Sequence, residues 1–278
     1  MAVRIITDSA ADLTDAESAE LGVGVVPLSI RFGTEEYVDR KDLTPAEFYA
    51  KLASASVLPE TAAPSPGAFE VAFRAALDGG AEAVVCINIS SLLSATMASA
   101  QNAARAIEGA DIRVVDSRSI TSGLGSQVKA AATAAAAGSS AEEVVALVED
   151  MVPRTRVYGA LDTLENLKKG GRIGGAQAML GTLLSIKPII DISSGEVQQE
   201  AKPRTRTKAL QHLVDKVVGA GAVENLSVMH GSAPDVEQFL DMLGHHHPRE
   251  RIHVGEIGAT IGVHGGPRVM GITYQVPS

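Results

Sequence analysis

Hydroxyl side chains that follow short apolar runs are the first candidates for chemistry in this sequence. In an α/β sheet, such positions gather at the cleft beyond the carboxyl ends of the strands, where hydroxyls and helix N-termini bind anions. Each one alone is typical of a helix cap, so the set indicates an anion site more strongly than any member. The candidates are Thr7, Ser9, Thr61, Ser90, Ser91 and Ser94.

His264 is a further candidate, within the glycine-rich stretch ATIGVHGGPRVMG at 259–271. We expect it in a turn between two strands. A structural histidine satisfied by its neighbours and a ligand contact are both compatible with this setting.

A basic, glycine-rich segment, NLKKGGRIGGAQAMLGTLLSIKPII, occupies residues 166–190. It contains neither the P-loop pattern nor the dinucleotide fingerprint, both of which have fixed spacings. GGRIGG follows an expected helix, which favours a helix C-cap and a tight turn with Arg172 in solvent. From 166 to 208 there are eight Lys or Arg and three acids, a local charge of +5 in a chain of −9. Such a region can attract an acidic partner or an anionic membrane surface.

Recognisable catalytic and metal motifs are missing. The chain has no G-x-S-x-G elbow, no H-E-x-x-H helix and no paired cysteines. His245, His246 and His247 lie in GHHHPRE, which is typical of a polar loop, and Cys86 in AVVCINI indicates a buried thiol. An enzyme with its own nucleophile or metal is therefore not supported, and we expect no cofactor.

Composition narrows the class further. The 278 residues, 45% of them hydrophobic, suffice for one large or two ordinary domains. A net charge of −9 with 3% aromatics argues against nucleic-acid binding. One cysteine, no signal-like N-terminus and no membrane-length apolar run predict a cytoplasmic protein.

Strand and helix patterns alternate along the chain, which predicts an α/β fold with parallel sheets flanked by helices. Thr44, Pro45 and Glu47 form a capping box, and Ser65 with Pro66 begins another helix that Gly79 and Gly80 end. We expect strands at 3–9, 23–32, 83–89, 112–117, 185–192, 225–230, 251–258 and 269–276. We expect helices at 10–21, 42–52, 63–77, 90–107, 121–138, 207–221 and 233–243.

The proline and charge cluster DMVPRTRV, at 150–157, predicts a domain boundary. We place an N-terminal lobe at 1–155 with the candidate hydroxyls, and a C-terminal lobe at 156–278 with the basic segment. Each lobe is expected to have a mostly parallel sheet. Two such lobes leave a ligand cleft between them.

The ordered motifs of the chain resemble the DegV family, which includes the fatty-acid-binding subunits of bacterial fatty acid kinase. The similarity extends over nearly the whole chain, and the segment at 164–190 is its most specific part. It is carried by ITDSAADL, VVPLSIRF, FYAKL, PETAAPSPGAF, ISSLLSAT, VVDS, LENLKKGGRIGGAQAMLGTLLSIKPII and GATIGVHGGP.

This resemblance implies a two-lobed protein that encloses one long-chain fatty acid. By the family's motifs, Thr61 and Ser94 bind the ligand carboxylate and His264 lies near the same head group. The sequence departs from the family pattern at four positions, which leaves the detailed head-group contacts and the ligand preference open. These are Ala62, Ala63, Ala95 and Arg268.

The resemblance also implies a partner, the ATP-dependent catalytic subunit of a fatty acid kinase. The basic segment is then the docking and phosphoryl-transfer face, with Arg172 near the head group. The other candidates there are Lys168, Lys169, Arg204 and Arg206. Transient contact with a membrane surface is compatible with the same charges.

A lipid ligand agrees with elementary energetics. Burial of about 14 methylenes at ~0.8 kcal/mol each contributes roughly 11 kcal/mol gross, against about 1.5 to 3 kcal/mol for a hydrogen bond to a charged group. The apolar residues after the glycines could line a tunnel for the acyl chain or belong to the ordinary core. They are Met179, Leu180, Leu183, Leu184 and Ile186.

Two other functions stay open on the sequence. Thr61, Ser94 and His264 could form a catalytic group acting on a lipid ester or a phospho-compound, which predicts turnover. A lipid-responsive regulator with no kinase partner is the third interpretation.

Overall fold

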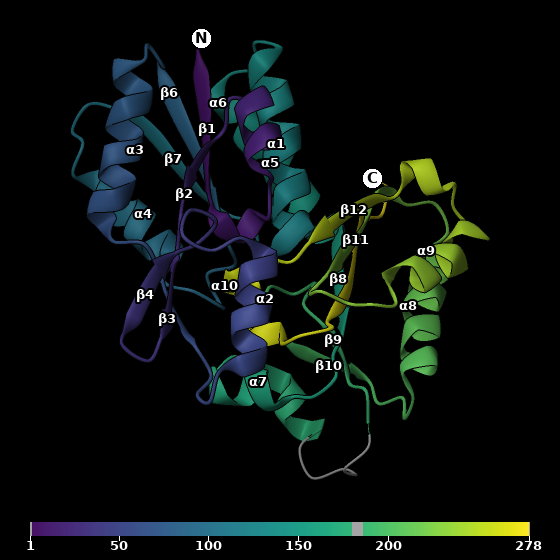
Figure 1. The fold of residues 1–278 in the computed structure, drawn as a ribbon. Coiled ribbons are helices and arrows are strands. Elements are labelled where there is room, and N and C mark those ends of the chain that lie inside the picture. Colours follow the sequence, from purple (N-terminus) through teal and green to yellow (C-terminus); the bar gives the residue numbers. More distant parts are fainter. Residues whose placement is uncertain (1, 180–185, 278) are drawn as a thin grey trace.

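The computed structural model describes residues 2–179 and 186–277, which form an α/β structure with three sheets (Figure 1). The first sheet has the order β2-β1-β6-β7 and is parallel throughout. Its central strand β6 is buried along its whole length, as a run without polar alternation predicts. The strands are β1 (Val3–Asp8), β2 (Gly24–Val26), β6 (Ala83–Asn88) and β7 (Asp111–Asp116).

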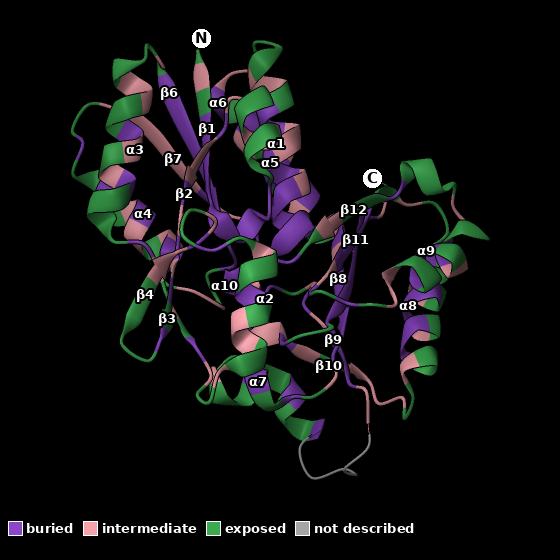
Figure 2. Cartoon of the chain, in the orientation of Figure 1, coloured by how far each residue is buried: buried purple, intermediate pink, exposed green. Residues whose placement is uncertain are grey.

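Helices cover both faces of this sheet, so the buried strands lie between exposed helical surfaces (Figure 2). Successive residues of β6 point to opposite faces. Cys86 packs with α3 and α4, while Val85 and Ile87 pack with α5 and α6. The helices are α3 (Pro66–Asp78), α4 (Thr96–Arg105), α5 (Thr121–Ala136) and α6 (Ala141–Met151).

The helix signals in the sequence are confirmed where they are strongest. Thr44 forms a capping box with Glu47 at the start of α2 (Pro45–Ser54), with Pro45 in the first turn. Ser65 caps α3, which ends at Gly79. Two expected helices begin later than predicted. Residues 90–95 form a loop before α4, and a short turn η1 (Ser9–Ala11) precedes α1 (Asp15–Glu20).

The expectation of one strand at 23–32 is wrong, because the chain changes sheets at Pro27. Proline has no N–H for a sheet ladder, and the next amide, Leu28 N, donates to Ser9 Oγ instead (3.1 Å). The following strand belongs to a small antiparallel sheet of order β4-β3-β5. Its strands are β3 (Ser29–Phe32), β4 (Glu35–Val38) and β5 (Glu60–Ala62).

The second large sheet has the order β10-β9-β8-β13-β11-β12. Only the β11–β12 pair is parallel, which corrects the expectation of a mostly parallel sheet in the C-terminal lobe. The chain's last strand, β13, inserts antiparallel between β8 and β11. The strands are β8 (Thr155–Ala160), β9 (Ile189–Asp191), β10 (Gln198–Ala201), β11 (Glu224–His230), β12 (His253–Glu256) and β13 (Met270–Gln275).

Helices α8 (Arg206–Ala220) and α9 (Val236–Gly244) pack on one face of this sheet, around Leu210, Phe239 and Ile272. The opposite face, including Val157 and Ile190, packs into the same core as α5 and α6. The second sheet therefore faces the first lobe directly. The short elements are η2 (Val152–Arg154), α7 (Glu165–Lys169), η3 (Gly174–Met179), η4 (Arg249–Arg251) and α10 (Ala259–Gly265).

Helix α10 joins the two parts of the chain. Val263 on α10 packs with Phe48 of α2 and Ile30 of β3, although more than 200 residues separate them. The predicted boundary after residue 155 falls within β8 and stays a prediction. No helix in the described ranges is both long and apolar enough to span a membrane.

Candidate functional site

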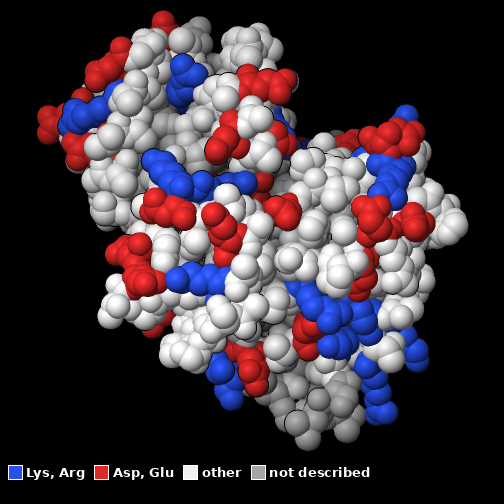
Figure 3. Space-filling view, viewed as in Figure 1, with Lys and Arg blue, Asp and Glu red and all other residues white. Residues whose placement is uncertain are grey.

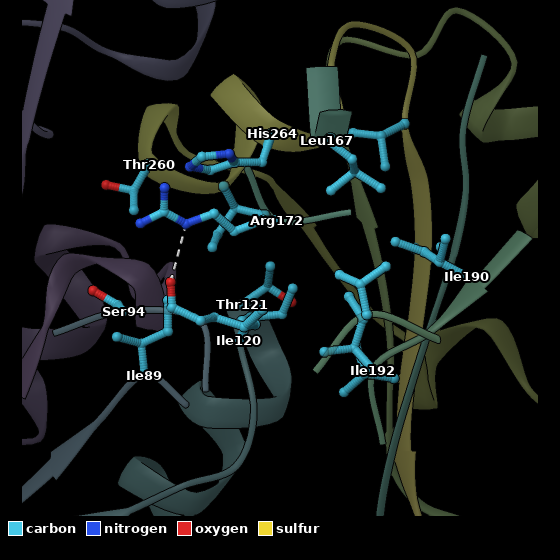
Figure 4. Close-up of a pocket in the computed structure, with 18 of the residues that line it drawn as sticks. Ile89, Ser94, Ile120, Thr121, Leu167, Arg172, Ile190, Ile192, Thr260 and His264 are labelled. Atoms are coloured by element: carbon cyan, nitrogen blue, oxygen red, sulfur yellow. Dashed lines mark hydrogen bonds between the residues drawn. The ribbon is translucent and has the colours of Figure 1, made fainter. Parts of the chain in front are cut away.

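A cavity lies between the second sheet, the small antiparallel sheet and the loops at the carboxyl ends of β6 and β7 (Figure 4). We call it the central cavity. Most of its wall is aliphatic, which favours an apolar ligand. The residues that form the wall include Ile89, Ile120, Leu161, Leu167, Ile190 and Ile192.

Thr61 and His264 meet at this cavity. Thr61 lies on β5, opposite Ile30 of β3, and His264 lies on α10. Thr61 Oγ1 and His264 Nε2 are hydrogen-bonded at 3.1 Å across 203 residues of sequence. His264 is thus in a helix rather than in the turn that we expected, because Gly258 to Gly265 continue the helical hydrogen bonding.

His264 is held in its neutral form. Burial, together with the positive charge of Arg172, lowers the pKa of His264 from 6.5 to about 4. Its other ring nitrogen, Nδ1, is buried and has no hydrogen-bond partner among the described residues. The imidazole is therefore a neutral hydrogen-bonding group at physiological pH.

Ser94 lies in the loop after β6, two residues before α4 begins at Thr96. Its hydroxyl is hydrogen-bonded to Thr96 Oγ1 (2.8 Å) and accepts a bond from Thr96 N (3.3 Å). Ala95 at the N-cap provides no side-chain cap. Ser94 therefore supplies the polar side chain at a helix N-terminus, which is a favourable setting for an anion.

Arg172 follows the turn that ends α7. Its Nε donates to Leu93 O (3.2 Å) and its Nη1 donates to Gly170 O (2.8 Å), so both bonds orient the guanidinium toward the cavity (Figure 4). Gly170 caps α7 and Gly171 adopts φ +70°, which confirms the prediction of a helix end and a tight turn. Arg172 is exposed, as the interpretation of a tight turn predicts, and it also lines the cavity.

The other basic candidates are dispersed. Lys169 lines a second hollow together with Arg172, Thr61 and His264, and Lys168 is exposed on α7. Arg204 is exposed and does not line the central cavity. Arg206, at the start of α8, forms an ion pair with Asp235 (2.8 Å), and this carboxylate partly neutralises its charge.

Figure 3 shows Lys and Arg gathered near β9, β10 and the start of α8, with acids interleaved. Asp162 bridges Lys187 (2.8 Å) and Arg268 (3.5 Å) in that region. The surface there is basic, and ion pairs compensate part of its charge. A docking role for it stays a prediction.

Of the proposed tunnel residues, Met179 and Ile186 belong to the main hydrophobic core and do not line the central cavity. Leu180, Leu183 and Leu184 lie outside the described residues. The observed wall comes instead from strand ends and loops of both sheets. The alternation of side chains between the two faces of β8 and β9 was the sequence signal that could have indicated these wall positions.

Among the four departures from the family pattern, Ala63 and Ala95 line the cavity, whereas Ala62 and Arg268 do not. Ala63 and Ala95 place methyl groups at the cavity wall. Arg268 adopts φ +62°, in the left-handed region that favours glycine.

Three contributors were missed by sequence reasoning. Thr260 lines the cavity from α10, Thr121 lines it from the start of α5, and Gly170 lies against His264 Nδ1. Gly170 and Thr260 lie within quoted family segments that assign them no role, and Thr121 lies outside those segments. They reach the site only because the fold brings distant segments of the chain together.

Among the described residues, no group of three or more His, Cys, Asp or Glu side chains is placed to hold a metal ion. His245 and His246 are exposed after α9, as a polar loop predicts. Cys86 is buried in β6, where burial raises its thiol pKa well above 9.0.

The fold and the cavity define an α/β protein that encloses an apolar chamber with hydroxyl, imidazole and guanidinium groups at one end. A family model described as "Uncharacterised protein, DegV family" matches residues 2–276, and the chain belongs to this family. A DegV domain-containing protein of Deinococcus radiodurans is 35% identical over 290 residues and covers 99% of each chain.

Solved structures share the complete fold. A DegV family protein from Thermus thermophilus, whose structure is described by its fatty acid binding, has a TM-score of 0.91 and 34% identity over all of both chains. DegV of Bacillus subtilis, described as a fatty acid binding protein, has a TM-score of 0.88 and 28% identity over the same coverage. A stearic acid-binding protein from Eubacterium ventriosum has a TM-score of 0.86 and 26% identity over 98% of each chain.

Proposed function

We propose that the protein binds a long-chain fatty acid in the central cavity and holds its carboxylate at Thr61, Ser94 and His264. The observation that carries this proposal is the Thr61–His264 pair at the end of an aliphatic chamber. Burial of the acyl chain supplies most of the affinity, and the polar groups orient the head group. The relatives from Thermus and Bacillus are described by fatty acid binding and the one from Eubacterium by stearic acid binding, which supports the same ligand class.

The site suits a carboxylate in detail. A neutral imidazole and two hydroxyls can donate hydrogen bonds without requiring a proton to be taken up. The guanidinium of Arg172 adds a positive charge on the same side. A buried carboxylate needs such donors, because desolvation of an unpaired charge is expensive.

The same geometry argues against a hydrolase. A serine- or threonine-dependent mechanism needs a base with a pKa near the working pH and a third group that orients this base. His264 has a pKa of about 4, and its Nδ1 faces no acceptor among the described residues. Ser94 bonds to Thr96 rather than to the histidine.

We further propose that the bound carboxylate is presented to a separate ATP-dependent kinase, which forms an acyl phosphate. Arg172 and Lys169 border the hollow outside the Thr61–His264 pair, where a phosphoryl group would approach. Cations at this position would stabilise the charge that develops during phosphoryl transfer. The resemblance to fatty acid kinase subunits supports this step.

The test is extraction of the freshly purified protein under denaturing conditions, followed by mass spectrometry of lipids per chain. We expect near-stoichiometric fatty acid in the wild type and less in Ser94→Ala. In a titration of the delipidated proteins, the affinity of Ser94→Ala should be lower by about 10-fold or more, as for a lost bond to a charged group. Ser54→Ala, an exposed serine at the end of α2, is the matched control. A wild type that is empty and takes up no added fatty acid would contradict the proposal.

A further inference from the structure

Among the described residues, five serine or threonine hydroxyls line the central cavity, and four of them are engaged within the protein. Thr61 bonds to His264, Ser94 bonds to Thr96, and Thr273 bonds to Ser122 Oγ (2.7 Å). Thr260 Oγ1 donates to Asp39 Oδ2 (2.5 Å). The fifth, Thr121, makes no side-chain hydrogen bond with any described residue.

Thr121 is deeply placed. It is only 4% exposed, and in Figure 4 it is drawn between Ser94 and Ile192. Its hydroxyl oxygen is not among the fully buried atoms that lack a partner, so it faces the open space of the cavity. A ligand oxygen there would supply the hydrogen bond that no described protein group provides.

The backbone at Thr121 is also strained. Its φ is +47°, in the left-handed region, which is a genuine outlier for a β-branched residue. Strain of this kind persists only where the surroundings fix the backbone, and it gathers at functional sites.

The surroundings of Thr121 do fix it. Ser122 is bonded to Thr273 of β13, and Gly123 lies so close to Ser119 and Val157 that a β-carbon would clash with both. Ser90 N donates to Ser119 O (3.0 Å), which ties this loop to the loop that carries Ser94. Thr121 and the carboxylate-binding candidate thus belong to two joined loops.

We propose that Thr121 is a lipid-binding residue whose hydroxyl bonds to an oxygen of the molecule in the central cavity. This inference rests on the proposed fatty acid binding and adds a polar contact that the family motifs did not indicate. The oxygen belongs either to the carboxylate or to a hydroxyl on the acyl chain. Both sources present the same chemistry to Thr121.

The experiment measures the affinity of the delipidated protein for hexadecanoate and for 3-hydroxyhexadecanoate. Thr121→Val keeps the volume and the β-branch but removes the hydroxyl, so we expect an affinity lower by about 3-fold to 100-fold. Equal loss for both lipids assigns the carboxylate as the partner. Loss for the hydroxylated lipid alone assigns the chain hydroxyl.

Two further variants separate binding from folding. Thr121→Ser restores the hydroxyl and should bind within about 3-fold of wild type. Thr121→Gly removes the hydroxyl and the left-handed strain together, so it should fold securely and still bind weakly. Thr133→Val, the same change at an exposed position of α5 away from the central cavity, is the matched control.

Unchanged affinity for both lipids in Thr121→Val and Thr121→Gly would overturn this inference while fatty acid binding stands. Failure of the wild type to bind either lipid would overturn the proposed function and this inference with it.

Discussion

Gly170 and His264 are in direct contact, such that a β-carbon at residue 170 would overlap Nδ1 of the imidazole. Gly170 ends α7, and His264 is on α10, so the contact joins the basic turn to the head-group residues. The glycine is therefore needed for space, at a φ of −77° that any residue can adopt.

Gly170→Ala should displace His264 and break its bond to Thr61. Because one hydrogen bond to a charged ligand is worth about 1.5 to 3 kcal/mol, fatty acid affinity should fall by roughly 10-fold or more. Titration of the delipidated variant with hexadecanoate measures this. Gly219→Ala on α8, where a β-carbon meets open space, is the control and should bind like wild type. Wild-type affinity in Gly170→Ala would show that the His264 position is unimportant.

His264 should stay neutral in the ligand-free protein until the pH approaches about 4. The pKa of His264 in the folded protein is below the ordinary 6.5, so the unfolded chain takes up a proton before the folded protein does. The contribution of His264 to stability is therefore complete above about pH 6.5 and is lost as pH falls from there toward 4. NMR titration of the imidazole measures this pKa directly. Arg172→Gln removes a nearby positive charge and should raise the pKa, and so should a bound carboxylate. A midpoint near 6.5 in the free protein would refute the assignment.

Asp12 is a second pH-sensitive group, buried at the seam between η1 and α10. It accepts a bond from Gly258 N (3.0 Å) and faces Arg40 at 3.5 Å. Burial raises its pKa from 3.8 to about 8, against the opposing charge of Arg40. Burial likewise raises the pKa of nearby Asp8 to about 6 and that of Asp39.

These three carboxyls therefore retain protons that the unfolded chain releases, and their contribution to stability should fall as pH rises from about 4 to 8. In Asp12→Asn, the free energy of unfolding should change less between about pH 5 and pH 8 than in wild type. Urea denaturation at both pH values is the measurement, with exposed Asp78→Asn as control. An unchanged pH dependence in Asp12→Asn would exclude Asp12 as its source.

Arg172→Ala tests the proposed kinase step separately from binding. The variant should retain fatty acid within about 3-fold, since the guanidinium is not the main source of affinity, while acyl-phosphate formation by the kinase falls by about 10-fold or more. Arg105→Ala, an exposed arginine at the end of α4, is the control and should have little effect. Full acyl-phosphate formation with Arg172→Ala would remove this residue from the mechanism.

The boundaries of several elements were predictable because their signals are local. The capping box at Thr44 and the proline after Ser65 fix helix starts through contacts within four residues. The continuous apolar run of β6 indicates a strand buried on both faces. The motifs around Thr61, Ser94 and His264 indicated the site residues through resemblance, and the structure brings Thr61 and His264 into contact.

What the sequence alone determined is thus the α/β class, the main helix starts and the DegV membership. Tertiary structure decided the sheet change at Pro27, the antiparallel second sheet and the composition of the cavity wall. It also placed Gly170 against His264 and left the Thr121 hydroxyl without a partner in the part of the chain that the structure describes. These features arise from pairings between segments far apart in the chain, such as β13 between β8 and β11. Local periodicity has no information about such pairings, because their energy depends on which distant surfaces meet.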